Sequence, residues 1–166
     1  DEIQCGFGRS GKLFSYQWTN IEPDIMAVAK GMGSGFPMGA CLATNDSSIG
    51  MTKGVHGTTY GGNPLAIAVG TAVINEIMTN NFLEKVEEVA RYLWLKLKQL
   101  ENDFDEILEI RGAGLLLGIK TKSDNIEINK IFISNGLLTI TASDNVIRLA
   151  PPLIVSKKNV DEAIEI

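Results

Sequence analysis

The stretch NNFLEKVEEVARYLWLKLKQLEN, residues 80–102, places apolar side chains at intervals of three and four. These side chains belong to Phe82, Val86, Val89, Leu93, Leu97 and Leu100. Their spacing predicts an amphipathic helix, because residues three and four apart share one helix face. The preceding stretch PLAIAVGTAVINEIM, residues 64–78, begins with a proline and carries small or apolar residues on nearly every side. It predicts a second helix, buried all round.

Helices and strands alternate in the sequence that follows residue 102. The predicted elements are a strand at 114–121 opened by the turn RGAG (111–114), a helix at 126–136, strands at 137–143 and 146–155, and a helix at 156–166. Gly136 suits a helix end, and Ser156 suits a helix N-cap. Pro151 and Pro152 would suit only an edge or a bend in the second strand. This alternation predicts an α/β or α+β arrangement.

Composition excludes several classes of function. The chain has 166 residues, 45% of them hydrophobic, and a net charge of −5 with the charges intermixed. Nucleic-acid binding is disfavoured because it needs clustered Lys and Arg, and no apolar run is long enough to span a membrane. Cys5, Cys41 and the single histidine His56 lack the spacing and number for a zinc site, so we predict no metal. We expect both cysteines to be small buried residues in a reducing compartment, the cytoplasm.

Residues 1–64 are rich in glycine and contain four groups of chemical interest. Asp1 and Gln4 lie in DEIQ, Lys30 lies in AKGMGSG, and HGTTYGGNP (56–64) runs directly into the helix predicted from residue 64. A helix N-terminus offers free N–H groups, which suit a phosphate. Pyridoxal phosphate needs a lysine for a Schiff base, an acidic partner for its pyridine nitrogen and donors for its phosphate. Taken singly, each feature is explained as well by a solvated lysine, a turn or an N-cap.

Several strings together resemble the class III pyridoxal-phosphate aminotransferases in order and spacing. They are DEIQCGFGRSGKLFSYQW (1–18), PDIMAVAKGMGSGFPMGACLAT (23–44), HGTTYGGNPLAIAVG (56–70), RGAGLLLGIK (111–120) and NVIRLAPPLIV (145–155). The resemblance runs through essentially the whole chain. It implies an α/β fold of type I pyridoxal-phosphate transferases, with only the C-terminal half present. Residues 1–78 would end the large cofactor-binding domain, and residues 79–166 would form the small α+β domain.

The resemblance also implies a role for individual residues. Lys30 matches the Schiff-base lysine, which also moves a proton as general acid and base. Asp1 matches the partner of the pyridine nitrogen, and Gln4 matches a glutamine near the phenolic oxygen of the cofactor. Thr59 matches a threonine that reaches the phosphate bound by the neighbouring subunit of a dimer. The remaining matches are to substrate contacts, at Thr58 and at Arg148, whose planar guanidinium suits a carboxylate.

His56 is a tempting catalytic candidate, but lysine already performs the proton transfer in this chemistry. We therefore expect His56 to be a structural loop residue. For Arg148, an arginine at a strand edge with its charge in solvent is the alternative to a substrate contact.

The implied activity is transfer of the terminal amino group of N-acetylornithine to a 2-oxo acid, 2-oxoglutarate in the family, within arginine biosynthesis. Ornithine and 4-aminobutyrate are alternative amino donors. A non-catalytic remnant or dimerisation module is the alternative outside enzyme function. Because the resemblance covers only the C-terminal half of the family, we expect residues 1–166 alone to be inactive.

Overall fold

The computed structural model describes residues 1–79 and 81–166, so Asn80, the first residue of the helix predicted at 80–102, lies outside the described residues. The chain folds into two compact units. The N-terminal unit comprises Asp1–Gly8 and Lys12–Phe82, and the C-terminal unit comprises Arg9–Gly11 and Leu83–Ile166. The predicted domains, 1–78 and 79–166, stay a prediction.

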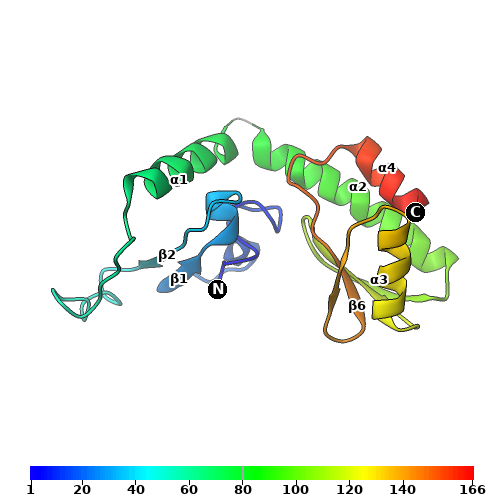
Figure 1. Cartoon of the computed structure of the whole chain (residues 1–166), viewed down its shortest axis with the longest axis horizontal. Coiled ribbons are helices and arrows are strands. Elements are labelled where there is room, and N and C mark those ends of the chain that lie inside the picture. The colour runs from blue at the N-terminus through cyan, green and yellow to red at the C-terminus, as the bar shows by residue number, and fades with distance from the viewer. Residues whose placement is uncertain (80) are drawn as a thin grey trace. The chain divides into compact units, whose positions relative to one another are not determined.

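The N-terminal unit is built on a pair of short antiparallel strands (Figure 1). Its elements are the 3-10 helix η1 (Ser15–Trp18), strand β1 (Ile25–Val28), the 3-10 helix η2 (Lys30–Gly33), strand β2 (Ala40–Ala43) and helix α1 (Pro64–Ile77). In the register of the pair, Ile25 lies opposite Ala43 and Val28 lies opposite Ala40. The glycine-rich sequence of this region indicates only loops, because both strands are too short to show an alternating pattern.

Helix α1 begins and packs as its sequence allows, but it is less buried than predicted. The side chain of Asn63 accepts a hydrogen bond from the backbone N–H of Ala66, and Pro64 stands in the first turn. The face of Ala66 and Gly70 is buried, and a side chain on Gly70 would meet Met38. Leu65 is 62% exposed, so the prediction of a helix buried all round is wrong for this chain. The buried face also includes Ile77, while the apolar side chains of Leu65 and Ile67 point away from it.

The C-terminal unit has a four-stranded antiparallel sheet in the order β3-β4-β6-β5. Its elements are α2 (Phe82–Asp103), β3 (Ile107–Ala113), β4 (Leu116–Thr121), α3 (Asn125–Ser134), β5 (Ile140–Ala142), β6 (Val146–Leu149) and α4 (Lys157–Glu165). The turn predicted at 111–114 is displaced, because β3 continues through Ala113 and the chain reverses at Gly114 and Leu115. Strand β6 ends before Pro151, so the prolines leave its pairing intact.

The core of the C-terminal unit joins its helices to the sheet. Its most completely buried side chains are Val86 and Leu97 of α2, Leu115 of the β3–β4 turn, and Ile147 of β6. Val86 and Leu97 belong to the apolar face that the sequence predicted for α2. Helix α4 lies along α2 (Figure 1) and begins at Ser156, which forms the predicted N-cap by accepting a hydrogen bond from the Asn159 N–H.

Neither cysteine is as buried as expected. Cys5 is half-buried, and Cys41 is exposed on β2, where all four residues are exposed. The expectation of two buried cysteines is therefore wrong. In the described part of the chain, no helix is both long and apolar enough to cross a membrane.

Candidate functional site

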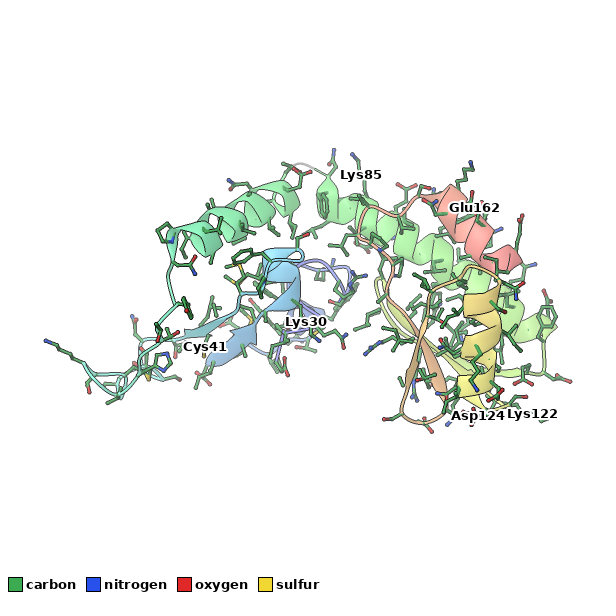
Figure 2. The ribbon with its side chains drawn as sticks, in the orientation of Figure 1. Lys30, Cys41, Lys85, Lys122, Asp124 and Glu162 are labelled. Atoms are coloured by element: carbon green, nitrogen blue, oxygen red, sulfur yellow. The ribbon has the colours of Figure 1, made fainter. Side chains whose placement is uncertain are left out.

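Lys30 stands where β1 ends and η2 begins, and its side chain is exposed (Figure 2). Its backbone φ is 41°, in the left-handed region that non-glycine residues seldom adopt. Such strain, where it occurs, is concentrated at functional sites. Ser34, with φ 45°, and Gly35, with φ 111°, continue the turn, so the glycine-rich sequence produces a tightly coiled connection rather than an open loop.

Close packing surrounds the residue after the lysine. A Cβ atom on Gly31 would lie 3.0 Å from Cβ of Phe7, which is itself buried with a φ of 55°. A side chain larger than hydrogen would push against this neighbour. Glycine at position 31 therefore lets the lysine turn approach the segment that begins at Asp1 without displacing Phe7.

Asp1 and Gln4 lie in the same unit as Lys30, on a turn at the start of the chain. The Asp1 carboxylate Oδ1 accepts a 2.8 Å hydrogen bond from the backbone N–H of Ile3. The backbone N–H of Glu2 donates to the carbonyl of Ala27 in β1, at 2.9 Å. The structure therefore joins the Asp1 turn to the strand that delivers Lys30. Both Asp1 and Gln4 are exposed.

Thr58 and Thr59 are exposed on the segment between β2 and α1, and so is His56. This segment extends beyond the β1–β2 pair (Figure 1). After Thr44, its backbone hydrogen bonds join near neighbours, as the bond from the Asn63 N–H to the Tyr60 carbonyl does. Among the described residues, no hydrogen bond links either threonine to Lys30.

Arg148 belongs to the C-terminal unit, in β6, where it is half-buried and lies opposite Gly118 and Ile140. It lines a cavity of about 410 Å³ whose wall is otherwise mainly apolar, with Leu93, Leu137 and Pro152 among its residues. An arginine in such a wall is placed to receive an anionic group on a largely apolar ligand.

Two charged residues that the sequence motifs do not single out have structural contacts. Arg9 donates from Nη1 to the carbonyls of Leu115, at 3.2 Å, and Pro151, and burial lowers its pKa. Glu2 is buried and accepts hydrogen bonds from two backbone N–H groups. No local pattern in the sequence sets these two charges apart from the polar residues beside them, such as Gln4 and Lys12.

The residues that the structure groups in the N-terminal unit fit the needs of pyridoxal phosphate. They offer an exposed amine at Lys30, a carboxylate at Asp1 and an amide at Gln4, with the neighbouring Glu2 N–H bonded to the strand before the lysine. Among the described residues, no group of three or more His, Cys, Asp or Glu side chains could hold a metal ion.

Comparison with known proteins identifies the family. The family described as aminotransferase class-III matches residues 1–166. The chain belongs to the class III aminotransferases. Members of this class use pyridoxal phosphate.

Curated relatives and solved structures agree with this assignment. The acetylornithine aminotransferase of Mesorhizobium japonicum is 51% identical over 99% of this chain, and that of Agrobacterium fabrum is 52% identical over 99%. The chain spans 41% of the length of each of these relatives. The solved ornithine δ-aminotransferase of Plasmodium falciparum matches with a TM-score of 0.92 and 34% identity, over 99% of this chain and 43% of that one. An acetylornithine aminotransferase from Elizabethkingia anophelis matches with a TM-score of 0.89 and 29% identity, over 99% and 42%. The fold class that the sequence predicted is confirmed.

Proposed function

We propose that residues 1–166 contribute the lysine-bearing part of a pyridoxal-phosphate aminotransferase that takes the terminal amino group of N-acetylornithine. The observation that carries this proposal is the 51% identity to an acetylornithine aminotransferase over 99% of the chain. The acceptor would be a 2-oxo acid, 2-oxoglutarate in the family, and the place of action the cytoplasm, in arginine biosynthesis.

Lys30 is the residue to which we assign the chemistry. Its exposed amine would hold the cofactor covalently and then move a proton on and off the carbon that bears the transferred amine. When bound, pyridoxal phosphate supplies the electron sink for that deprotonation. The left-handed backbone at Lys30 supports this assignment, because it fixes the direction in which the side chain leaves the end of β1.

The remaining assignments concern binding. The Asp1 carboxylate would accept a hydrogen bond from the pyridine nitrogen, and Gln4 would bind near the phenolic oxygen. Thr59 would reach a phosphate in the second subunit of a homodimer, a role supported by its exposure. Thr58 would contact substrate, and Arg148 would bind a substrate carboxylate, for which its place in the cavity wall is suited.

Ornithine is the second candidate donor, because solved ornithine aminotransferases match the chain with TM-scores of 0.92. The two donors differ at the α-nitrogen, which is acetylated in one and a free amine in the other.

A graft tests the function directly. The 165 matched residues of the M. japonicum relative are replaced by the corresponding residues of this chain. We expect the graft to turn over N-acetylornithine in preference to ornithine. Borohydride reduction followed by mass spectrometry should locate a pyridoxyl group on Lys30. Lys30→Ala should abolish both results, while Lys53→Ala, at an exposed lysine of the same unit, should change neither.

A graft that keeps activity after Lys30→Ala would contradict the assigned role, and preference for ornithine would replace the proposed donor. The chain covers 41% of its relatives, so we expect residues 1–166 alone to turn over neither donor. Turnover by the 166-residue chain would overturn that expectation.

A further inference from the structure

Glu2 is the one ionisable residue among the buried polar side chains in the described part of the chain, with 5% of its surface exposed. Burying a carboxylate is costly unless hydrogen bonds replace its water. Oε1 of Glu2 accepts a 2.9 Å bond from the Tyr16 N–H, and Oε2 accepts a 2.9 Å bond from the Ser15 N–H. The Cys5 thiol also donates to Oε2, at 3.3 Å. Both carboxylate oxygens are thus committed to holding protein backbone.

The two N–H groups belong to Ser15 and Tyr16 at the start of η1, so the Glu2 side chain connects η1 to the turn at the beginning of the chain. The neighbouring Phe14 ring packs edge-on against the ring of Phe7, with 5.5 Å between centroids. Phe7 in turn supports Gly31, since a Cβ on that glycine would lie 3.0 Å from Cβ of Phe7. A continuous set of contacts therefore runs from the Glu2 carboxylate to the residue beside Lys30.

The main chain of Glu2 makes a second connection to the same place. Its N–H donates to the Ala27 carbonyl in β1, and its own carbonyl accepts a 3.0 Å bond from the Gly6 N–H. A Cβ on Gly6 would lie 2.7 Å from the Glu2 carbonyl oxygen, so this turn admits no larger residue. Glu2 therefore contacts the segments that carry Asp1 and Gln4 as well as the strand that leads to Lys30.

We propose that Glu2 is a positioning residue that holds the Asp1–Gln4 turn and the Lys30 turn in one arrangement through its buried, backbone-bonded carboxylate. The inference rests on the proposed function, in which these two turns bind the same cofactor. Glu2 itself would touch neither cofactor nor substrate, because its carboxylate oxygens are occupied by Ser15, Tyr16 and Cys5.

The test uses the graft into the M. japonicum relative with Glu2→Gln and, as a matched control, Glu22→Gln at an exposed glutamate of the same unit. Glutamine has nearly the same shape, but its NH₂ group would face a backbone N–H and one bond would be lost. A hydrogen bond to a charged group is worth about 1.5–3 kcal/mol, so we expect amide exchange to accelerate about tenfold or more. The acceleration should extend beyond residues 15–16 to residues 28–33, as followed by mass spectrometry. Acceleration confined to residues 15–16 would overturn the proposal, because the carboxylate would then serve its local turn only.

A second measurement asks whether the effect reaches the lysine side chain. The graft, with each substitution in turn, is incubated with pyridoxal phosphate and reduced with borohydride, and the labelling of Lys30 is compared with that of Lys53. We expect Glu2→Gln to lower the preference for Lys30 about tenfold and Glu22→Gln to leave it unchanged. Unchanged preference in Glu2→Gln would also overturn the proposal.

The two measurements separate this proposal from the proposed function. If the graft without substitutions labels Lys30 and Lys53 equally, the role of Lys30 is contradicted, yet the exchange data still decide whether Glu2 organises both turns. If Glu2→Gln does not fold, Glu2→Asp takes its place in both measurements. Aspartate keeps the charge, but its side chain is one methylene shorter and cannot reach Ser15 and Tyr16 in the same way.

Discussion

Gly114 occupies a position in the C-terminal unit where a side chain has no room. A Cβ there would lie 2.2 Å from the carbonyl carbon of Ser10 and 2.4 Å from the backbone nitrogen of Gly11, and the φ of Gly114 is 58°. Gly136 also has a positive φ, 91°, but no atom lies within 4 Å of its Cβ position. Substituting each glycine by alanine therefore distinguishes a steric clash, present only at Gly114, from backbone strain, present at both positions.

We expect Gly114→Ala to lower the free energy of unfolding by about 3 kcal/mol or more. The new methyl group would displace the backbone of Ser10 and Gly11, and alanine would also be strained at this positive φ. Gly136→Ala should cost only about 1–2 kcal/mol, the cost of the left-handed conformation. Urea unfolding followed by Trp94 fluorescence measures both. Equal costs in the two variants would show that the chain at Ser10 and Gly11 yields to the new methyl group.

For individual residues, the sequence motifs identified the candidates but did not show which residues surround them. DEIQ and AKGMGSG led to Asp1, Gln4 and Lys30 through resemblance to a family. The burial of Glu2 in the same string depends on residues 15 and 16, which fold back over it. Sequence spacing does not report such a contact.

The elements of the C-terminal unit follow from their own patterns, and α2 shows this best. Val86, Leu93 and Leu97, which the spacing placed on one face, are all buried. Strand β3 was missed because its buried residues do not alternate regularly, and a register shift interrupts its pairing between Ile107 and Glu109. Local periodicity therefore identified the long helix, while the sheet pairing was needed to recognise the irregular strand.

Helices α2 and α4 are joined through Asp161. The Tyr92 hydroxyl donates to its Oδ1 at 2.6 Å, and Lys96 Nζ lies 3.3 Å from the same oxygen. The hydrogen bond from Tyr92 is the main cause that lowers the pKa of Asp161 below its ordinary 3.8, and Lys96 adds to it. The folded state is therefore favoured above the ordinary pKa, and this stabilisation is lost as the pH falls through the lower, folded value.

We expect Asp161→Asn to be less stable than the unmodified chain at neutral pH, with the difference shrinking as the pH falls below 3.8. Urea midpoints across that range measure it, and Asp105→Asn, at an exposed aspartate before β3, controls for the general loss of one carboxylate. A difference that stays constant down to acid pH would show that the carboxylate charge does not hold α4 on α2.

Across the whole molecule, burial is unevenly divided between the two units. The side chains with the least exposure, Val86, Leu97, Leu115 and Ile147, all belong to the C-terminal unit. In the N-terminal unit, residues 50–62 are exposed throughout, and the backbone hydrogen bonds that join them, such as that from the Val55 N–H to the Thr52 carbonyl, reach only near neighbours. Resistance to local opening should follow this difference in burial.

We expect limited trypsin digestion to cut first after Lys53, which is exposed in that segment. Cleavage after Lys120 should be much slower, because β4 is paired on both sides and must open before a protease can bind it. Mass spectrometry of the early products measures the order. Early cleavage after Lys120 would contradict the inferred stability of the sheet.

The sequence by itself determined the family, the α/β class, the long amphipathic helix and the identity of the candidate cofactor residues. The family, the fold type and the candidate residues came from the resemblance of several motifs to known aminotransferases, and the helix came from the spacing of its apolar residues. Only the tertiary structure decided that α1 buries a single face, that Cys41 is exposed, and that Glu2 is buried between two turns. Burial is a property of contacts between residues far apart in the chain, and the same side chain is covered or exposed according to what folds against it.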